Sequence, residues 1–466
     1  MERYDVAIIG AGMSGIAAGI RLAHFGKKVC IFERHYASGG LNSFYAKDGR
    51  KYDVGLHAMT NFTGPGDRRA PLNRIIRQLR ISREDLKLCE QNGSRIAFPG
   101  ANLRFNNDFA YFESEIESVF PKQIDGFQKL VAAIRSFDDN EFNYVYRSAR
   151  EVVRSCVNDP VLEDMIFCPL MYYGSSTEED MDFGQFVIMF KSIFFEGFAR
   201  PLEGIRNIIR LLLKRYRESG GIRKMNTGVA KIVAVDNQVD RLILDNGEEV
   251  QADVVLSSAG LPETYALCEP QPELETPVSP GRLAFTETIS VFKDQPESFG
   301  WGDDTIVFFN SRDRFSYREA SDPVDLTSGV ICIPNNFQFG DEQMPEGVVR
   351  VTCLSNYAKW KGYGEEDYAE SKEQWRPRIW EAAKVFMPPT ALDYDQACIA
   401  HDMFTPTTVE RYTWRKQGAI YGAPQKTKDG TTPISNLFIC GTDQGFLGIV
   451  GSMLSGIAMA NTHALR

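Results

Sequence analysis

The sequence is poor in the residues that build metal centres and disulfide frameworks. It contains only 5 His and 9 Cys among 466 residues. No two Cys form a CxxC pair, and no His lies four residues from another. We therefore expect no zinc or iron site made of protein ligands. The odd number of scattered Cys indicates reduced, buried thiols of the cytosolic type rather than a disulfide framework.

Long apolar runs and an excess of positive charge are also missing. The most apolar later segment, 183–199, is interrupted by Lys191 and Glu196, so a transmembrane span is not expected. Residues 6–22 are apolar, but the residues before them do not supply the basic region of a signal peptide. We therefore expect a cytoplasmic protein. If it touches the inner face of a membrane, the contact should come from an apolar patch rather than a basic one.

The charge balance and the missing motifs exclude further classes. Lys and Arg number 52 against 62 Asp and Glu, a net charge of −10, which argues against nucleic-acid binding. The sequence has no GxSxG, no HExxH and no P-loop, and it has no internal repeat. Aromatic residues are in excess, at 12%. They are consistent either with a large apolar cavity or with an ordinary core.

The first thirty residues predict a complete βαβ unit. An apolar strand at 4–9 leads into a GxGxxG loop, a helix that ends at Gly26, and a second strand at 27–33. In such a loop Gly10 permits the tight turn, Gly12 lets a pyrophosphate approach the backbone, and Gly15 lets helix and strand pack closely. The predicted dinucleotide contacts are Gly10, Gly12, Met13, Ser14, Gly15 and the acidic Glu33, which would accept ribose hydroxyls.

Two further features favour FAD over NAD. Gly19 extends the loop pattern to GxGxxGxxxG, which brings the helix closer to the sheet. Ser38-Gly39-Gly40 follows the second strand and suits another close approach of backbone to a pyrophosphate, although a plain loop turn would look the same. Glu33 would repel a 2′-phosphate, so NADP is disfavoured.

In the rest of the chain, segments predicted to be helical alternate with segments predicted to form strands. Residues 66–200 are expected to be mostly helical, and 202–219 predicts an amphipathic helix closed by Gly220-Gly221. A β-meander and a further strand are predicted over 229–256. Apolar runs at 285–293, 305–310, 329–334 and 348–354 predict a separate antiparallel sheet, and a helix is expected at 367–386. A strand, a glycine loop and a final helix are expected after Asn436.

These pieces together resemble the FAD-dependent carotenoid and retinoid oxidoreductases within the amine-oxidase-like flavoproteins: the carotenoid desaturases, carotenoid isomerases and retinol saturases. The matching segments are FERHYASGGLNSFYAKDGRKYDVGLH, TPTTVERYTWRKQGAIYG and LFICGTDQGFLGIVGSMLSG. The family usually has Gly-Asp in the last segment. This chain has Gly441-Thr442-Asp443, which, like Val54-Gly55-Leu56-His57, is closer to the retinol saturase branch.

The resemblance implies an α/β fold with a Rossmann-type FAD-binding domain and a discontinuous α+β substrate domain that contains an antiparallel sheet and a helical cap. The expected FAD domain comprises 1–65, 202–280 and 425–466, and the substrate domain 66–201 and 281–424. Beyond the loop residues, the implied cofactor contacts are Arg34, Gly39, Gly40, Leu41, Val229, Gly441, Asp443, Gly448 and Val450. Val229 would meet adenine, Asp443 a ribityl or phosphate oxygen, and Gly448 to Ser452 would pass under the isoalloxazine.

The resemblance predicts hydride transfer between FAD and the double bonds of a long apolar polyene or other unsaturated lipid, with desaturation, saturation and isomerisation all left open. A flavin amine oxidase acting on a small amine is the alternative, and a non-catalytic flavoprotein is a third class. His57 is the candidate for a polar catalytic group near the flavin, or it is a structural histidine. The aromatic block at 183–198 lines a substrate tunnel, contacts a membrane or is core, and Tyr172 and Tyr173 share this ambiguity.

Overall fold

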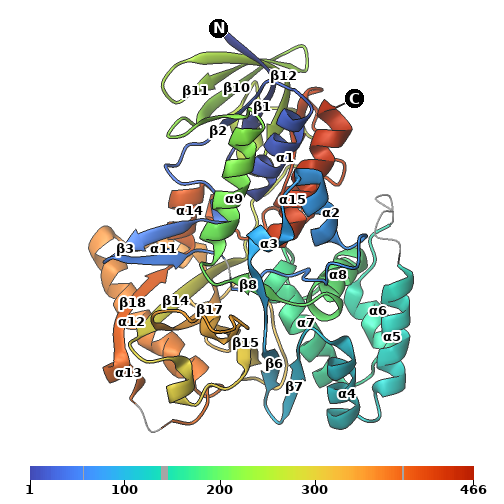
Figure 1. Ribbon diagram of the computed structural model, residues 1–466, viewed down its shortest axis with the longest axis vertical. Helices are drawn as coiled ribbons and strands as arrows, with labels where there is room; N and C mark the ends of the chain where they lie inside the picture. Colours follow the sequence, from blue (N-terminus) through green and yellow to red (C-terminus); the bar gives the residue numbers. More distant parts are fainter. Residues whose placement is uncertain (56, 138–144, 391–392, 466) are drawn as a thin grey trace.

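The computed structural model describes residues 1–55, 57–137, 145–390 and 393–465. Figure 1 shows two layered units, one above the other, each built on a large sheet. Both chain termini lie in the upper unit, and the chain passes repeatedly between the two, so each sheet combines segments that are far apart in sequence.

The first sheet has eight described strands. In spatial order they are β13 (Cys268–Glu269), β10 (Val229–Val235), β11 (Gln238–Leu244), β12 (Glu249–Ser257), β1 (Glu2–Ile9), β2 (Val29–Phe32) and β9 (Ile222–Lys224), with β19 (Leu437–Ile439) beside the end of β12. β1 is parallel to β12 and to β2, so their carboxyl ends meet at one edge. In an open α/β sheet this edge is where ligands bind.

Helices cover one face of this sheet: α1 (Met13–His24), α9 (Ile205–Glu218) and α15 (Gly448–Met459), with α2 (Pro71–Leu79) and α3 (Arg83–Leu86) beside them. Their apolar side chains form one core with β1 and β2. Side chains on the other face form a second core, which includes residues of β10, β11 and β12 and Leu267 of α10 (Leu261–Leu267). The predicted βαβ unit, the helix closed by Gly220 and the final helix are therefore present.

The second sheet has seven strands, in the order β18 (Cys398–Phe404), β14 (Ala284–Phe292), β17 (Gly347–Ser355), β16 (Ser328–Cys332), β15 (Asp304–Asn310), β6 (Gly93–Phe98) and β7 (Ala101–Phe105). The four predicted strands form its centre. The expectation that 66–200 is mostly helical and that this sheet is antiparallel was incomplete, because β6 and β7 come from that segment and β6 pairs parallel to β15. The sequence does not reveal β6 and β7 because neither strand is long or strongly apolar.

Smaller strands and helices complete the molecule. The pairs are β3 (Phe44–Lys47) with β4 (Arg50–Asp53), and β5 (Leu88–Glu90) with β8 (Ala199–Pro201). One face of the second sheet carries α4 (Phe109–Val119), α5 (Ile124–Ser136), α6 (Ala149–Cys156), α7 (Pro160–Gly174) and α8 (Phe183–Phe190). The opposite face carries α12 (Glu365–Lys384). The remaining helices are α11 (Tyr357–Lys361), α13 (Tyr394–Ala397) and α14 (Pro406–Thr413).

The aromatic block at 183–198 is core. Phe186, Phe190 and Phe198 have no exposed surface, and Phe194 stacks on Phe112 with ring centroids 4.3 Å apart. The block therefore anchors α8 against α4, α5 and α7. Within the described residues, no helix combines the length and the apolar character needed to cross a membrane.

Helices α1 and α15 approach each other closely enough to require glycine. A Cβ at Gly456 would lie 2.0 Å from the carbonyl oxygen of Ser14. We expect Gly456→Ala to lower the free energy of unfolding by about 1–3 kcal/mol, since the two helices must separate. Urea unfolding followed by circular dichroism measures this. Gly64→Ala is the control, because a Cβ there meets open space, and an equal loss in both variants would contradict the interpretation.

Candidate functional site

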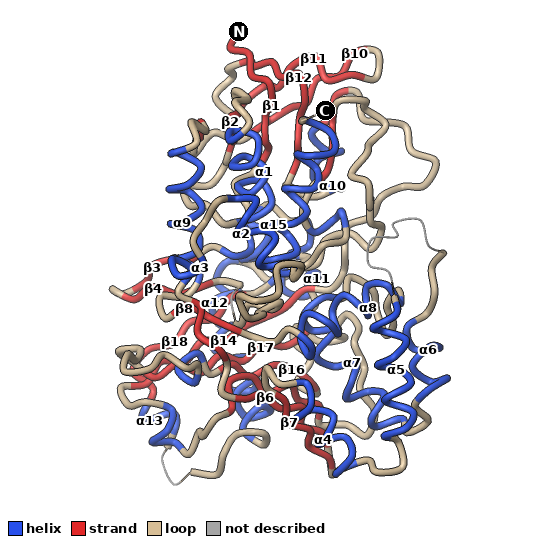
Figure 2. The backbone as a smooth tube through the Cα atoms, turned by 45° about the vertical axis from the view of Figure 1, so that its right-hand side comes forward, coloured by secondary structure: helices blue, strands red, loops and turns tan. Residues whose placement is uncertain are grey.

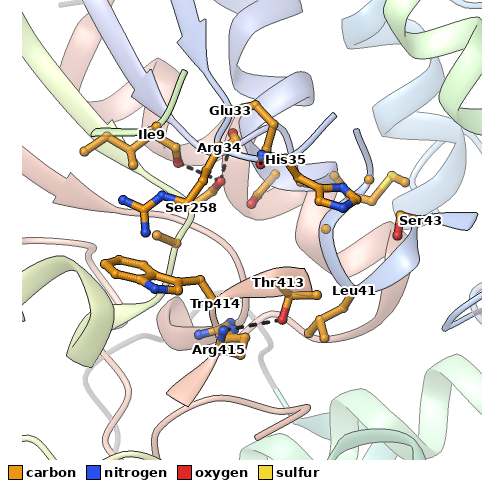
Figure 3. Close-up of a pocket in the computed structure, with 18 of the residues that line it drawn as sticks. Ile9, Glu33, Arg34, His35, Leu41, Ser43, Ser258, Thr413, Trp414 and Arg415 are labelled. Atoms are coloured by element: carbon orange, nitrogen blue, oxygen red, sulfur yellow. Dashed lines mark hydrogen bonds between the residues drawn. The ribbon is translucent and has the colours of Figure 1, made fainter. Parts of the chain in front are cut away.

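A pocket opens at the carboxyl edge of the first sheet, where the chain leaves β1 and β2 (Figure 3). Most of the predicted dinucleotide contacts line it: Gly10, Gly12, Met13, Ser14, Glu33, Arg34, Gly39, Gly40, Leu41 and Val229. Ser258, Trp414 and Arg415 close it from other parts of the chain. The structure therefore brings together residues that the sequence places more than four hundred positions apart.

The glycine loop leaves the first turn of α1 open toward this pocket. Gly12 is the N-cap, and no side chain caps the backbone N–H groups of the first turn. Unsatisfied N–H groups and the positive end of the helix dipole favour an anion at this position. A Cβ at Gly15 would lie 2.2 Å from the Gly10 carbonyl oxygen, so Gly15 acts by packing and does not line the pocket.

Glu33 and Arg34 shape the far end of the pocket. The Glu33 carboxylate accepts hydrogen bonds from the backbone N–H of Ala11 (2.7 Å) and of His35 (2.8 Å), which ties the second strand to the glycine loop. The Arg34 guanidinium donates to the Val229 carbonyl oxygen at 3.0 Å and lies 4.0 Å from the centre of the Trp414 indole ring. Figure 3 shows the side chains of Arg34 and Trp414 next to each other. Arg34 and Trp414 therefore form one wall.

A second cavity, here called the chamber, adjoins the pocket between the two sheets. Leu41, Asn42, Thr442 and Ser452 line both cavities, so the two are neighbours along one continuous path. The chamber is mainly apolar and aromatic. Its lining includes Val54, Tyr172, Tyr173, Phe285, Val330, Phe404, Ile420, Tyr421, Leu447 and Gly448.

His57 belongs to a buried polar cluster on one side of the chamber. Its Nε2 lies 2.6 Å from Glu287 Oε2 and 3.1 Å from the Thr352 hydroxyl, which itself donates to Glu287. Arg350 donates to the other carboxylate oxygen of Glu287 and to the backbone carbonyls of Asp53 and Val54. The cluster therefore joins the second sheet to the segment that follows β4.

The ionisation of this cluster is set by burial and by Arg350. Burial raises the pKa of Glu287, but the Arg350 guanidinium and His57 outweigh it and hold the pKa below its ordinary value. Burial lowers the pKa of His57 below 6.5, despite the neighbouring carboxylate. Near neutral pH, Glu287 is therefore ionised and His57 is a neutral imidazole with one nitrogen able to accept a proton.

The remaining predicted residues lie elsewhere. The Asp443 carboxylate is fully buried and is bound by the N–H groups of Leu261 and Ala423 and by Arg415 and Lys426, so it lines neither cavity. Burial lowers the pKa of Lys426 to about 8 despite this carboxylate. Gly441 packs on Ser14. Gly448 lines the chamber, whereas Val450 lines a third cavity beyond it.

Several lining residues were not predicted from the sequence. Ser258 belongs to no sequence motif. Its hydroxyl donates to the carbonyl oxygens of Ile9 and Gly10 and so holds the turn that follows β1. Glu287 and Arg350 each interrupt an apolar strand, and a charged residue in such a strand was the available signal. The register between β14 and β17 places Thr352 opposite Glu287 and Arg350 two residues from Thr352, close enough to donate to the Glu287 carboxylate.

Comparisons with known proteins agree with this arrangement. Residues 13–462 match the model of the family described as flavin-containing amine oxidoreductases. The chain is 22% identical to the chloroplastic prolycopene isomerase of Daucus carota, over 99% of this chain and 80% of that protein. It is also 22% identical to the all-trans-retinol 13,14-reductase of Danio rerio, over 98% of this chain and 85% of that one. The resemblance to carotenoid and retinoid oxidoreductases is confirmed.

A solved structure shares the fold. Wild-type putrescine oxidase bound to putrescine superposes with a TM-score of 0.64 at 14% identity, covering 100% of this chain and 99% of that one. The expected α/β architecture is therefore confirmed. Because the family model spans nearly the whole length, the chain belongs to the family of flavin-containing amine oxidoreductases, and FAD is its cofactor.

Proposed function

We propose that this protein transfers hydride between FAD and the carbon–carbon double bonds of a long apolar polyene or other unsaturated lipid. The observation that carries the proposal is the lining of the chamber. Its only carboxylate among the described lining residues, Glu287, is already paired with Arg350, and the rest is largely aliphatic or aromatic. Such a lining suits an apolar substrate, since a cationic one would leave its charge without a free partner.

The two neighbouring cavities fit an elongated dinucleotide. We assign the pyrophosphate to the open first turn of α1 and to Gly39 and Gly40. We assign the adenosine ribose to Glu33, whose carboxylate would accept the ribose hydroxyls in place of the backbone N–H groups that it now binds. Adenine would lie at Val229. Gly441 and Asp443 would support the ribityl side from behind, through Ser14 and Arg415.

The chamber would hold the isoalloxazine ring and the substrate. Helix α15 begins at Gly448 with no side-chain cap, so its first-turn N–H groups are available to the pyrimidine end of the ring, where negative charge collects on reduction. Val450, two residues further on, lines the third cavity instead of the chamber. Bound FAD supplies the hydride acceptor or donor at its N5 atom. The division into FAD and substrate domains predicted above is kept in this proposal.

The chain's own contribution is exclusion of water and handling of one proton. Tyr172, Phe285 and Leu447 keep the chamber dry. Making or removing a C–H pair by hydride transfer also requires that a proton be added or removed at the neighbouring carbon. Neutral His57, oriented by ionised Glu287, is the group beside the chamber that can take or return this proton.

A small amine is the second candidate substrate. Tyr172, Tyr173 and Tyr421 all line the chamber, and aromatic faces can bind a cationic amine in place of a carboxylate. The family description and the similarity to the putrescine-bound structure support this alternative substrate.

Glu33→Gln should weaken FAD binding about tenfold, because the neutral amide makes a weaker hydrogen bond to ribose hydroxyls than a carboxylate does. The FAD-to-protein ratio after repeated gel filtration measures this. The exposed Glu117→Gln is the matched control. Equal FAD retention in all three proteins would remove Glu33 from the cofactor site.

Mixing the protein with unsaturated lipids and amines tests the substrate class. Under anaerobic conditions we expect the oxidised protein to be bleached, or the photoreduced protein to be reoxidised, by long-chain polyenes and not by small amines. Stopped-flow absorbance of the flavin bands follows both reactions. Bleaching by an amine with release of hydrogen peroxide in air would contradict the lipid proposal and establish the alternative.

His57→Gln should retain FAD but lower the rate of the flavin's reaction with the polyene about a hundredfold, the range expected for loss of a general acid or base. In the unaltered protein the rate of flavin reduction, in which His57 accepts the proton, should fall only at a pH well below the ordinary histidine pKa of 6.5, because burial lowers the pKa of His57 and delays its protonation. The variant should lose that pH dependence. His401→Gln, on the exposed strand β18, is the control, and an unchanged rate in His57→Gln would make the residue structural.

A further inference from the structure

The segment before and within α2 concentrates positive charge. Residues 68–83 contain six Arg, whereas Asp67 is the only acidic residue between 54 and 83. Arg68, Arg69, Arg74 and Arg77 are exposed, and none forms an ion pair with a described residue. In a chain with a net charge of −10, four such unpaired guanidinium groups on one surface are unusual.

These four Arg surround a cavity of about 760 Å³, a size typical of sites for small ligands. Its floor is apolar and comes from Ile188 of α8, from Val450 and Leu454 of α15, and from Phe446 just before α15. Figure 1 shows α2 beside α15, above α8. The cavity is therefore basic at its mouth and apolar at its base.

The charges at the mouth do not cancel. Leaving aside Lys191, which donates to the Phe137 carbonyl oxygen, the lining contains the four Arg against two carboxylates, Asp67 and Glu196, a difference of 4 − 2 = +2. The Asp67 carboxylate accepts hydrogen bonds from the backbone N–H groups of Arg69 and Ala70, and Glu196 accepts one from Asn61. Both acids therefore serve local structure, and the Arg face the solvent.

A thin wall separates this cavity from the chamber. Met189 and Leu447 line both cavities. Thr60 lines the chamber, whereas the next residue, Asn61, lines the basic cavity. Methionine has a flexible thioether chain that changes rotamer readily, so Met189 is suited to move aside for an extended apolar chain.

We propose that this cavity is the entrance for the substrate and that the substrate is a free amphiphile with an anionic carboxylate or phosphate head. The head would be held by Arg68, Arg69, Arg74 and Arg77, and the apolar chain would pass between Met189 and Leu447 to the flavin. This inference rests on the function proposed above and specifies its substrate class. A neutral hydrocarbon would leave the four guanidinium groups without a function.

A fluorescent polyene acid tests the proposal. The FAD-loaded protein is titrated with cis-parinaric acid and, separately, with its uncharged methyl ester, and binding is followed by parinaroyl fluorescence and by the shift of the flavin absorption bands. We expect the acid to bind about tenfold more tightly than the ester, and both to perturb the flavin. The double substitution Arg74→Gln/Arg77→Gln should remove the preference for the acid and leave ester binding and FAD content unchanged.

The control removes the same charge elsewhere. Arg104→Gln/Arg312→Gln alters two exposed Arg outside the cavity and should bind the acid as the unaltered protein does. Equal affinity for acid and ester, or an unaltered preference in Arg74→Gln/Arg77→Gln, would overturn the anionic head while leaving the proposed function intact. Binding of neither polyene would overturn both.

A vesicle experiment separates a free amphiphile from a membrane surface. Flotation is measured with vesicles of dioleoylphosphatidylcholine alone and with an added fraction of dioleoylphosphatidylglycerol. We expect the Arg74→Gln/Arg77→Gln variant to lose parinaric acid affinity. If the variant instead loses only vesicle binding and keeps its affinity for the free acid, the four Arg bind a membrane surface and the proposal is wrong.

Discussion

The close approach of α1 to the carboxyl end of β1 is the constraint on which the rest of the site depends. The Gly15 Cα sits against the Gly10 carbonyl, and the Gly456 Cα sits against the Ser14 carbonyl, so three segments meet with no room for a side chain. This contact points the first turn of α1 into the pocket and places the start of α15 at the chamber. One packing arrangement therefore positions the groups that face both ends of the cofactor.

A second constraint is electrostatic and ties the second sheet to the end of β4. Arg350 and Glu287 lie on neighbouring strands of the second sheet, and Arg350 also holds the backbone of Asp53 and Val54, which follows the first glycine-rich segment. Removing one member of such a buried pair typically costs about 3–5 kcal/mol, because the other charge is left unpaired. The same pair orients His57, so the group that handles protons in the proposed reaction is fixed by the contact that ties the second sheet to the end of β4.

The sequence predicted the parts of the site that are local in the chain. The glycine loop, Glu33, Gly39 and Gly40 fall within forty residues, and their spacing alone specifies a strand, a turn and a helix. Trp414, Ser258, Glu287 and Arg350 were missed because they reach the site only through sheet register and crossover connections. Strands β6 and β7 were missed for a related reason: they are short, and β6, which carries β7, pairs with β15 from about two hundred residues away. Asp443 stays a predicted cofactor contact; its carboxylate is buried against Arg415 and Lys426 and lines neither described cavity.

The net charge of the whole chain did not predict the charge of the surface at the mouth of the basic cavity. The total of −10 argued against nucleic acid as a partner and led to the expectation that any contact with a membrane would be apolar. The arginines of residues 68–77 fall on one loop and one helix, and the fold sets them around an apolar floor that abuts the chamber. These four positive charges are few beside the total for the chain. They matter because they line the cavity that Met189 and Leu447 separate from the chamber. Selection among apolar chains of similar shape can then be made at the head group, where a charge discriminates far more strongly than one methylene does.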